Sequence, residues 1–391
     1  MRHLYYYIPL IALLVIAAAC RQDEEILVPE HIVVTQPELT DITGFYLLNE
    51  GNMGMNKCSL DYYDYTTGTY SRDIYGDINP DVVKDLGDVG NDIGIYGERL
   101  YCVINCSNKV EVMDRTTARR IGQVNIPNCR YIKFAGGYAY VTSYAGPVMF
   151  DYNYKQLGYV AKIDTATLQI VDTCLVGYQP DGLEIVNDKI YVANSGGYLI
   201  DQASGENNYE TTVSVIDINT FKEEERIEIA QNLHYCLADR RGVLWVSSRG
   251  DYYTDFGSLT AYDILHRRVL KRLDCNIGDM WLDGDSLYVV SSVWSYVSGG
   301  FGGNAFKIID TRTMEVVSEN FITDGTDARI TKPYGVAVNP VTKDIYVTDA
   351  KAYVNPGRLF CFGSDGKLRW EVRTGDIPAH FAFVGKNHNE H

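Results

Sequence analysis

Two short elements alternate along the chain, and their repetition constrains the fold more than any other feature of the sequence. One is an aromatic residue followed by an apolar residue, as expected in a buried β-strand. Its copies begin at Tyr46, Tyr101, Tyr140, Tyr191, Trp245, Tyr288 and Tyr346. The other is an apolar residue followed by Asp and a turn. Its copies are Tyr63-Asp64, Met113-Asp114, Ile163-Asp164, Ile216-Asp217, Tyr262-Asp263, Ile309-Asp310 and a degenerate seventh, Phe362-Gly363-Ser364-Asp365.

Each repeat predicts four short strands. The third repeat shows them best, because alternating apolar and polar residues are separated there by turn residues. The strands expected in it are Tyr131–Phe134, Tyr138–Tyr144, Tyr159–Asp164 and Ile170–Val176. Four strands in roughly 50 residues match one propeller blade. Seven repeats therefore predict an all-β fold, a seven-bladed β-propeller spanning residues 44–391.

The first repeat lacks its first strand, because Phe45-Tyr46-Leu47 already matches the second strand of the other repeats. The missing strand lies at the other end of the chain, where Pro378–Val384 matches Pro180–Val186 and Pro333–Val338. We therefore expect the C-terminal strand to close the first blade. Such a closure leaves the ring without an open sheet edge.

The N-terminus has the pattern of a bacterial export signal. The apolar stretch Leu4–Ile16 follows a short basic start and is too short to span a membrane. The run Ala17-Ala18-Ala19-Cys20 resembles a lipobox, at which lipoproteins are cleaved and lipidated. We expect residues 1–19 to be a lipoprotein signal peptide and Cys20 to carry acyl chains; cleavage by ordinary signal peptidase is the alternative. Residues 20–43 begin with acidic residues and are expected to form a lipid-anchored tether.

One face of the predicted propeller carries most of its irregular sequence. The loops between second and third strands lie on the same face as the crossovers between blades. Five of these loops are long and rich in Tyr, of which the chain has 31 against 12 Phe. Long loops on a rigid scaffold often carry function, although they can also vary freely, with their Tyr residues packed on one another. The candidate ligand-binding residues on this face are Arg130, Tyr131, Tyr144, Asp181, Asn194, Tyr235, Arg249, Trp294, Tyr334, Tyr353 and His380.

Charge and motifs narrow the possible functions. With 35 Lys and Arg against 51 Asp and Glu, the net charge of −16 disfavours nucleic-acid binding. No GxSxG, HExxH, P-loop or paired-His motif occurs, so we expect a binding protein with no catalytic residues. The cysteines form no CxxC pair, and the spacing of Asp81, Asp85, Asp88 and Asp92 fits no calcium loop, so no metal is expected. One or two disulfides stay possible in an exported protein.

Parts of the first repeat resemble a known group of proteins. Asn49-Glu50-Gly51-Asn52, Ser59–Asp64 and Thr67-Gly68 are similar to the opening blade of the YncE-like surface lipoprotein propellers of gut Bacteroidetes. Length, Tyr content and the acidic tether most resemble the BtuG-type cobalamin-binding lipoproteins. The resemblance implies an outer-membrane protein, lipid-anchored and exposed at the cell surface. It also implies capture of cobalamin (vitamin B12) or a related corrinoid, as transported ligand and not as cofactor, for a TonB-dependent outer-membrane transporter.

Two other functions remain open at the level of sequence. A surface propeller of this kind could instead bind a glycan or a protein on the same Tyr-rich face. Carboxylates that face the channel could alternatively hold a catalytic metal, as in lactonase propellers, which would make the protein a metal-dependent hydrolase.

Overall fold

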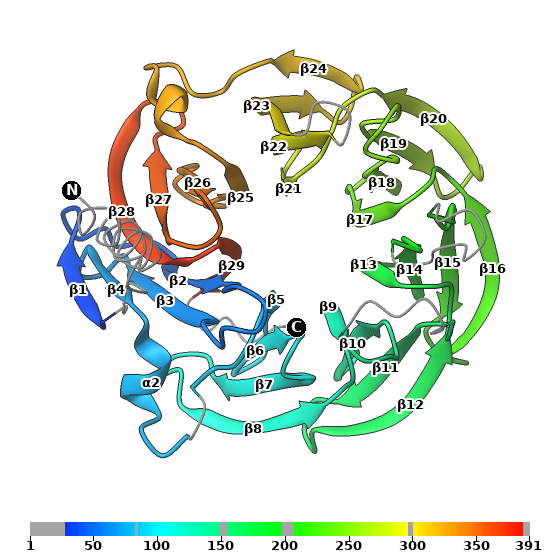
Figure 1. Ribbon diagram of the computed structural model, residues 1–391, viewed down its shortest axis with the longest axis horizontal. Helices are drawn as coiled ribbons and strands as arrows, with labels where there is room; N and C mark the ends of the chain where they lie inside the picture. Colours follow the sequence, from blue (N-terminus) through cyan, green and yellow to red (C-terminus); the bar gives the residue numbers. More distant parts are fainter. Residues whose placement is uncertain (1–27, 83–84, 149–154, 198–206, 296–299, 386–391) are drawn as a thin grey trace, which may run out of the picture.

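Seven antiparallel sheets surround a central axis like the blades of a propeller (Figure 1). The all-β, seven-bladed propeller expected from the repeat is therefore confirmed. None of the helices in the described part of the chain is long and apolar enough to span a membrane. The computed structural model describes residues 28–82, 85–148, 155–197, 207–295 and 300–385, with the backbone only for 293–295, 300 and 301.

Blade one combines both ends of the described chain, and the other six blades are consecutive along the sequence. From the inside outward, blade one consists of β29 (Pro378–Gly385), β2 (Ile42–Asn49), β3 (Ser59–Asp64), β4 (Thr69–Arg72) and β1 (Glu30–Val33). Blades two to four, each listed from the inside outward, are β5 (Gly90–Tyr96), β6 (Arg99–Ile104), β7 (Lys109–Asp114) and β8 (Arg120–Asn125); β9 (Cys129–Ala135), β10 (Tyr138–Ser143), β11 (Tyr159–Asp164) and β12 (Gln169–Leu175); β13 (Pro180–Val186), β14 (Lys189–Asn194), β15 (Thr212–Asp217) and β16 (Lys222–Glu228). Blades five to seven are β17 (Leu233–Ala238), β18 (Val243–Ser248), β19 (Ser258–Asp263) and β20 (Arg268–Leu273); β21 (Asp279–Asp283), β22 (Ser286–Ser295), β23 (Gly300–Asp310) and β24 (Glu315–Ser318); β25 (Pro333–Val338), β26 (Ile345–Asp349), β27 (Pro356–Phe362) and β28 (Leu368–Asp376). Two short helices, α2 (Ile74–Ile78) and the 3₁₀ helix η1 (Thr326–Arg329), lie between blades.

In six of the seven blades the repeated Asp is the last residue of the third strand and shapes the turn that follows, whereas in blade seven Asp365 lies three residues beyond the end of β27. In blade three, a carboxylate oxygen of Asp164 accepts hydrogen bonds from the backbone N–H groups of Ala166 and Thr167, at 2.9 and 2.8 Å. Asp217 makes the same two bonds in blade four. A side chain that satisfies the backbone of its own turn favours that turn locally. The repeated Asp therefore has a structural role in the turns of these blades.

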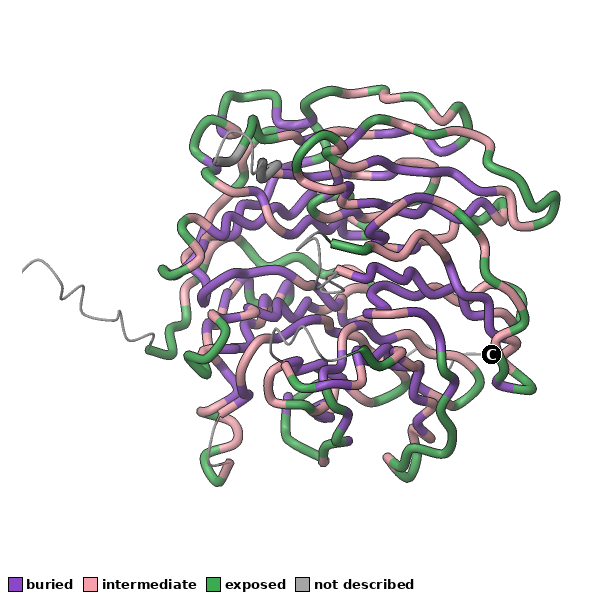
Figure 2. The backbone as a smooth tube through the Cα atoms, turned by 45° about the vertical axis from the view of Figure 1, so that its right-hand side comes forward, coloured by how far each residue is buried: buried purple, intermediate pink, exposed green. Residues whose placement is uncertain are grey.

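The repeated aromatic residue lies in the second strand and packs in the core between blades. Tyr101, Tyr140, Trp245 and Tyr346 are almost completely buried. Figure 2 shows the same pattern along the whole chain, with burial concentrated in the strands and exposure at the turns. Buried Tyr hydroxyl groups find partners: those of Tyr65 and Tyr346 lie 2.6 Å apart. Many of the Tyr residues therefore pack in the core, and only some of them belong to a ring-rich binding face.

The C-terminal strand closes blade one, as expected. Strand β29 pairs antiparallel with β2, with Ala382 opposite Tyr46 and His380 opposite Leu48. Phe381 and Val384 of this strand are buried in the core. The C-terminal strand thus supplies the innermost strand of the first blade.

The propeller was expected to begin at residue 44, and this boundary is wrong because the first blade includes residues that come earlier in the chain. Strand β1, Glu30–Val33, falls in the segment expected to be a tether, yet it pairs antiparallel with β4 as a fifth strand on the outer edge of blade one. Arg72 holds it there, through an ion pair with Glu30 at 2.9 Å and a hydrogen bond to the carbonyl of Val28. Residues 1–27, including the expected signal peptide and Cys20, lie outside the described residues.

One of the five predicted loops is largely strand. In blade six, β22 runs to Ser295 and β23 begins at Gly300, so both strands extend into the segment 293–303 that was expected to be a loop, and they pair as far as these two residues. The eight cysteines of the described chain form no disulfide, and all but Cys106 are buried.

Candidate functional site

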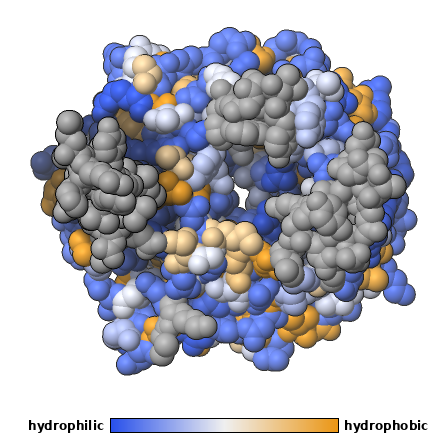
Figure 3. All heavy atoms as spheres, viewed as in Figure 1, coloured by the Kyte–Doolittle hydropathy of each residue, from blue (hydrophilic) through white to orange (hydrophobic). Residues whose placement is uncertain are grey.

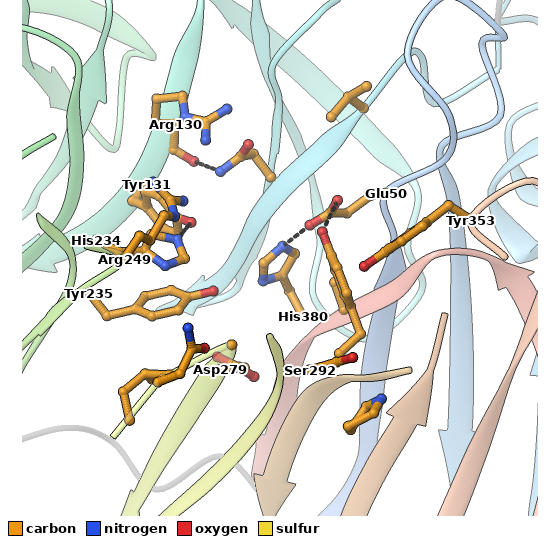
Figure 4. Close-up of a pocket in the computed structure, with 18 of the residues that line it drawn as sticks. Glu50, Arg130, Tyr131, His234, Tyr235, Arg249, Asp279, Ser292, Tyr353 and His380 are labelled. Atoms are coloured by element: carbon orange, nitrogen blue, oxygen red, sulfur yellow. Dashed lines mark hydrogen bonds and ion pairs between the residues drawn. The ribbon is translucent and has the colours of Figure 1, made fainter. Parts of the chain in front are cut away.

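A cavity of about 460 Å³ lies over the mouth of the central channel. Six of the seven inner strands contribute a residue from near their first positions, because all inner strands begin on the face that carries the crossovers. Figure 3 shows the opening at the centre of the ring, surrounded mainly by hydrophilic side chains, and Figure 4 shows the cavity in close-up. Its polar and aromatic lining comprises Glu50, Asn91, Arg130, Tyr131, His234, Tyr235, Arg249, Tyr252, Asn276, Asp279, Ser292, Tyr334, Tyr353 and His380.

The structure brings most of the predicted site residues together. Seven of them line the cavity: Arg130, Tyr131, Tyr235, Arg249, Tyr334, Tyr353 and His380. Tyr144 and Asp181 are buried beside it and support the two arginines. Trp294 belongs to β22, but its side chain lies outside the described part.

Asn194 has a structural role and does not line the cavity. Its side chain is fully buried at the end of β14. The amide oxygen accepts a hydrogen bond from the backbone N–H of Gly177 at 3.1 Å, and the amide nitrogen donates to Ser214 Oγ at 2.9 Å. These bonds fasten the end of the outer strand of blade three to blade four. The prediction that Asn194 contacts ligand therefore finds no support in its position.

Asp181 organises one side of the cavity. Its completely buried carboxylate accepts hydrogen bonds from Arg130 Nε at 3.1 Å, from Tyr144 Oη at 2.6 Å and from Arg249 Nη1 at 2.7 Å. Burial alone would raise its pKa, but the positive charges of Arg249 and Arg130 outweigh burial and bring the pKa of Asp181 to about 2. The carboxylate is therefore ionised at neutral pH, and both guanidinium groups are held in place.

A second group on this side is uncharged. Tyr131 Oη lies 2.8 Å from His234 Nε2, and the His234 and Tyr235 ring centroids are 3.7 Å apart. Burial, together with the nearby charge of Arg249, holds the pKa of His234 well below its usual value, so the imidazole is neutral. Neutral rings packed in this way form an apolar wall beside the arginines.

Glu50 organises the opposite side (Figure 4). Its carboxylate accepts a hydrogen bond from Tyr334 Oη at 2.8 Å and lies 3.1 Å from His380 Nε2. Burial lowers the pKa of His380, but the bond to Glu50 outweighs burial and raises it. Tyr353 packs edge-on against Tyr334, with ring centroids 5.9 Å apart. This side therefore presents acceptors and rings, whereas the other presents cations.

Carboxylates mark the point where the cavity narrows into the channel. Asp279 accepts a hydrogen bond from the backbone N–H of Val336 at 2.8 Å, and Asp92 does the same for Ile132 at 2.9 Å. Each bond joins the inner strands of neighbouring blades. Burial raises the pKa of Asp279 to about 6 and also raises that of Asp92. A smaller hollow of about 140 Å³, lined in part by both residues, continues below.

Sequence reasoning missed Glu50 as a site residue, although a signal for it exists. Glu50 directly follows the second strand of its blade, just as Tyr144 and Arg249 follow theirs. Aligning the ends of the second strands would have placed all three on the face of the propeller that carries the cavity. Tyr252 lies in one of the long Tyr-rich loops that the sequence indicates, although nothing distinguishes it there from the other Tyr residues. Asn276 lies in a connection and Ser292 near the end of a strand, and no pattern marks these two.

The cavity offers no ready set of metal ligands. Among the described residues, no group of three or more His, Cys, Asp or Glu side chains is placed to hold a metal ion.

The model of a protein family, Domain of unknown function (DUF5074), matches residues 43–361. The chain belongs to the DUF5074 family. No curated protein matches the chain. The family match covers blade one from its second strand to the third strand of blade seven, so the cavity of this DUF5074 protein is built largely within it.

Two solved structures share the fold of this DUF5074 protein. Hydrazine synthase of Kuenenia stuttgartiensis superposes with a TM-score of 0.56 at 18% identity, covering 71% of this chain and 77% of that chain. A quinoprotein alcohol dehydrogenase-like protein from Bacteroides thetaiotaomicron gives 0.55 at 14% identity, covering 88% of this chain and 78% of that chain. At such identities the likeness extends to the fold and not to activity.

Proposed function

We propose that this DUF5074 propeller binds cobalamin or a related corrinoid at the cavity over its channel. In this proposal the ligand passes unchanged to a TonB-dependent outer-membrane transporter. The observation that carries the proposal is the lining of the cavity, which combines several Tyr rings with two guanidinium groups held in place. Corrinoids present a broad ring system, amide arms and a nucleotide tail, so a matching site needs both kinds of group.

The size of the cavity indicates how such a ligand would sit. A hollow of about 460 Å³ lies within the range of ordinary small-molecule sites. A corrinoid is larger, so part of it would enter the mouth of the channel while the rest stays above the loops. Tyr334 and Tyr353 on one side and Tyr235 on the other would contact the ring faces.

The polar groups of the cavity support binding without a chemical step. Asp181 is engaged by Arg130 and Arg249, and Glu50 is engaged by Tyr334 and His380. Each carboxylate therefore already stabilises neighbouring side chains, as expected for a preorganised binding surface. We accordingly propose a carrier and not an enzyme.

The path of the chain also suits a surface anchor. Strand β1 lies on the outer edge of blade one, so a tether from a lipidated Cys20 would join the ring at its rim. An anchor at the rim leaves the cavity, at the centre of the ring, open to ligand. We therefore propose that the protein is held at the outer face of the outer membrane by its lipid alone.

Calorimetric titration of the purified protein with cyanocobalamin tests this function. We expect binding of one ligand per chain. Replacing Tyr235 and Tyr353 with Ala should weaken binding by several kcal/mol, because two facing rings are lost. The matched control is Asp188→Ala, in an exposed turn on the opposite face, which should leave the affinity unchanged. Absence of binding at millimolar ligand, or loss of affinity in the control alone, would overturn the proposal.

A further inference from the structure

The backbone around Glu50 fixes this residue at the edge of the cavity. Its N–H donates to the carbonyl of Ile377 at 2.8 Å, and its own carbonyl accepts from the N–H of Gly90 at 2.9 Å. The next residue, Gly51, has a φ of +74°, and a Cβ added there would lie 2.6 Å from the carbonyl carbon of Lys57. The chain therefore turns tightly after β2, at a position that only glycine fits, and Glu50 has little freedom to leave the cavity.

The side chain of Glu50 is held as well, yet it can still accept hydrogen bonds. Oε2 accepts from the Tyr334 hydroxyl group at 2.8 Å, and Oε1 lies 3.1 Å from His380 Nε2. These contacts occupy two of the four lone-pair positions of a carboxylate. The side chain is 16% exposed and lines the cavity (Figure 4). A preorganised acceptor is therefore open to N–H or O–H groups of a ligand.

Contact between Glu50 and a carboxylate of the ligand would be unfavourable. A primary amide presents two N–H donors to such an acceptor, whereas two ionised carboxylates have no proton to share and repel each other. Moving deeper would not relieve the repulsion, because Asp279 lies at the base of the cavity and is ionised at pH 8. His380 offers little compensation, because its imidazole is already paired with Glu50.

The Tyr rings of the cavity would bring the arms of a corrinoid to this carboxylate. Tyr334 bonds to Glu50 and packs against Tyr353, so both rings lie on the same side as the carboxylate. Tyr235 lies across the cavity (Figure 4). A corrinoid whose ring faces contact these side chains would have arms of its perimeter beside Glu50. The arms end in primary amides, so an arm in this position can donate a hydrogen bond to the carboxylate.

We infer that Glu50 determines specificity in this cavity: it accepts a primary amide arm of the corrinoid and rejects an arm that ends in a carboxylate. This inference rests on the proposed function. Glu50 thus makes the site selective for fully amidated corrinoids, and the repulsion of the wrong group contributes to this selectivity as much as the attraction of the right one.

The monocarboxylic acids of cyanocobalamin test the inference, because each isomer has one propionamide arm hydrolysed to a carboxylate and is otherwise unchanged. Calorimetric titrations at pH 8, where the arm is ionised, compare each isomer with cyanocobalamin. With the wild type, at least one isomer should bind about 10-fold to 100-fold more weakly than cyanocobalamin, because its carboxylate would lie at Glu50.

Glu50→Gln removes the charge and keeps an acceptor of nearly the same shape. It should bind the disfavoured isomer more tightly than the wild type does, to within about threefold of its affinity for cyanocobalamin. Cyanocobalamin itself should bind Glu50→Gln about 3-fold to 10-fold more weakly, because a charged acceptor makes the stronger hydrogen bond. A misfolded variant cannot gain affinity for one ligand while it loses affinity for another, so the opposite changes also verify folding.

The matched control is Glu98→Gln, in a turn on the opposite face where the side chain is 65% exposed, and it should keep the preference of the wild type. If every isomer binds the wild type as tightly as cyanocobalamin, or if Glu50→Gln keeps the wild-type preference, the role of Glu50 is wrong while the proposed function stands. If the wild type binds none of these ligands, the proposed function is wrong and the inference falls with it.

Discussion

At the residue scale, some of the side chains that line the cavity could be predicted from the sequence and others could not. Arg130, Tyr235 and His380 were predictable because each stands near the start of an inner strand, a position fixed by the repeat. Asn194 was predicted because it stands where a long loop begins after a second strand, but its side chain turns inward and bonds to Gly177 and Ser214. A repeat fixes where a residue lies along a strand, but the backbone groups that compete for its side chain depend on the neighbouring blade.

Asp279 should limit the stability of the folded protein at neutral pH. Burial raises its pKa from 3.8 to about 6, so the folded state favours the protonated form. The free energy of unfolding that depends on protonated Asp279 is therefore fully present below about pH 4, and it is lost as the pH rises through 6. Asp279→Asn removes the charge that burial disfavours, so it should increase the free energy of unfolding at pH 8 by about 2 to 3 kcal/mol. The amide oxygen of the new Asn can still accept the hydrogen bond from the backbone N–H of Val336.

Urea unfolding of both proteins at pH 4 and pH 8 checks this expectation. The difference between them should approach zero at pH 4. An equal difference at both pH values, or a less stable variant at pH 8, would show that the ionised carboxylate of Asp279 is compensated by its surroundings.

At the element scale, the regular strands were predictable and the irregular ones were not. Strands β9 to β12 fall within two residues of their expected bounds, since turns and apolar alternation are local signals. Strand β1 was missed because its sequence, Glu-His-Ile-Val, is short, mostly exposed and outside the repeat. The hairpin of β22 and β23 was expected to be a loop because its Gly-rich sequence resembles one.

Removal of strand β29 should unfold the ring. A chain ending at Ile377 would lose the partner of β2 and expose the core that Phe381 and Val384 cover. Burial of these two side chains alone contributes roughly 3 to 6 kcal/mol, a large part of the stability of an ordinary domain. We expect the truncated protein to lose its cooperative thermal transition by circular dichroism. A chain ending at Gly385 is the matched control and should melt like the full-length protein; an intact transition in the shorter chain would mean that closure is dispensable.

At the scale of the whole molecule, repetition and variation have separate roles. Residues that repeat, such as Asp164 and Asp217 in their turns, build blades of the same four-stranded plan. Residues at equivalent positions that differ between blades, such as Glu50 and Arg249, meet at the mouth of the channel. A ring brings seven such positions to one axis, so one scaffold can hold a cationic and an anionic side within one cavity. The repeat therefore predicts the number of blades, whereas the chemistry of the cavity depends on the residues that differ between blades.

The molecule as a whole is acidic, yet the affinity for cyanocobalamin should depend little on salt. Cyanocobalamin carries no net charge, because its cobalt centre balances the phosphodiester, so the net charge of −16 exerts little force on it at long range. Salt therefore has little long-range interaction to screen, and it screens buried contacts in the cavity only weakly. The dissociation constant and the association rate for cyanocobalamin should each change less than about threefold between 50 mM and 500 mM NaCl. Stopped-flow absorbance at both salt concentrations measures both quantities. A tenfold loss of affinity at high salt would instead mean that solvent-exposed ion pairs, and not rings and buried arginines, hold the ligand.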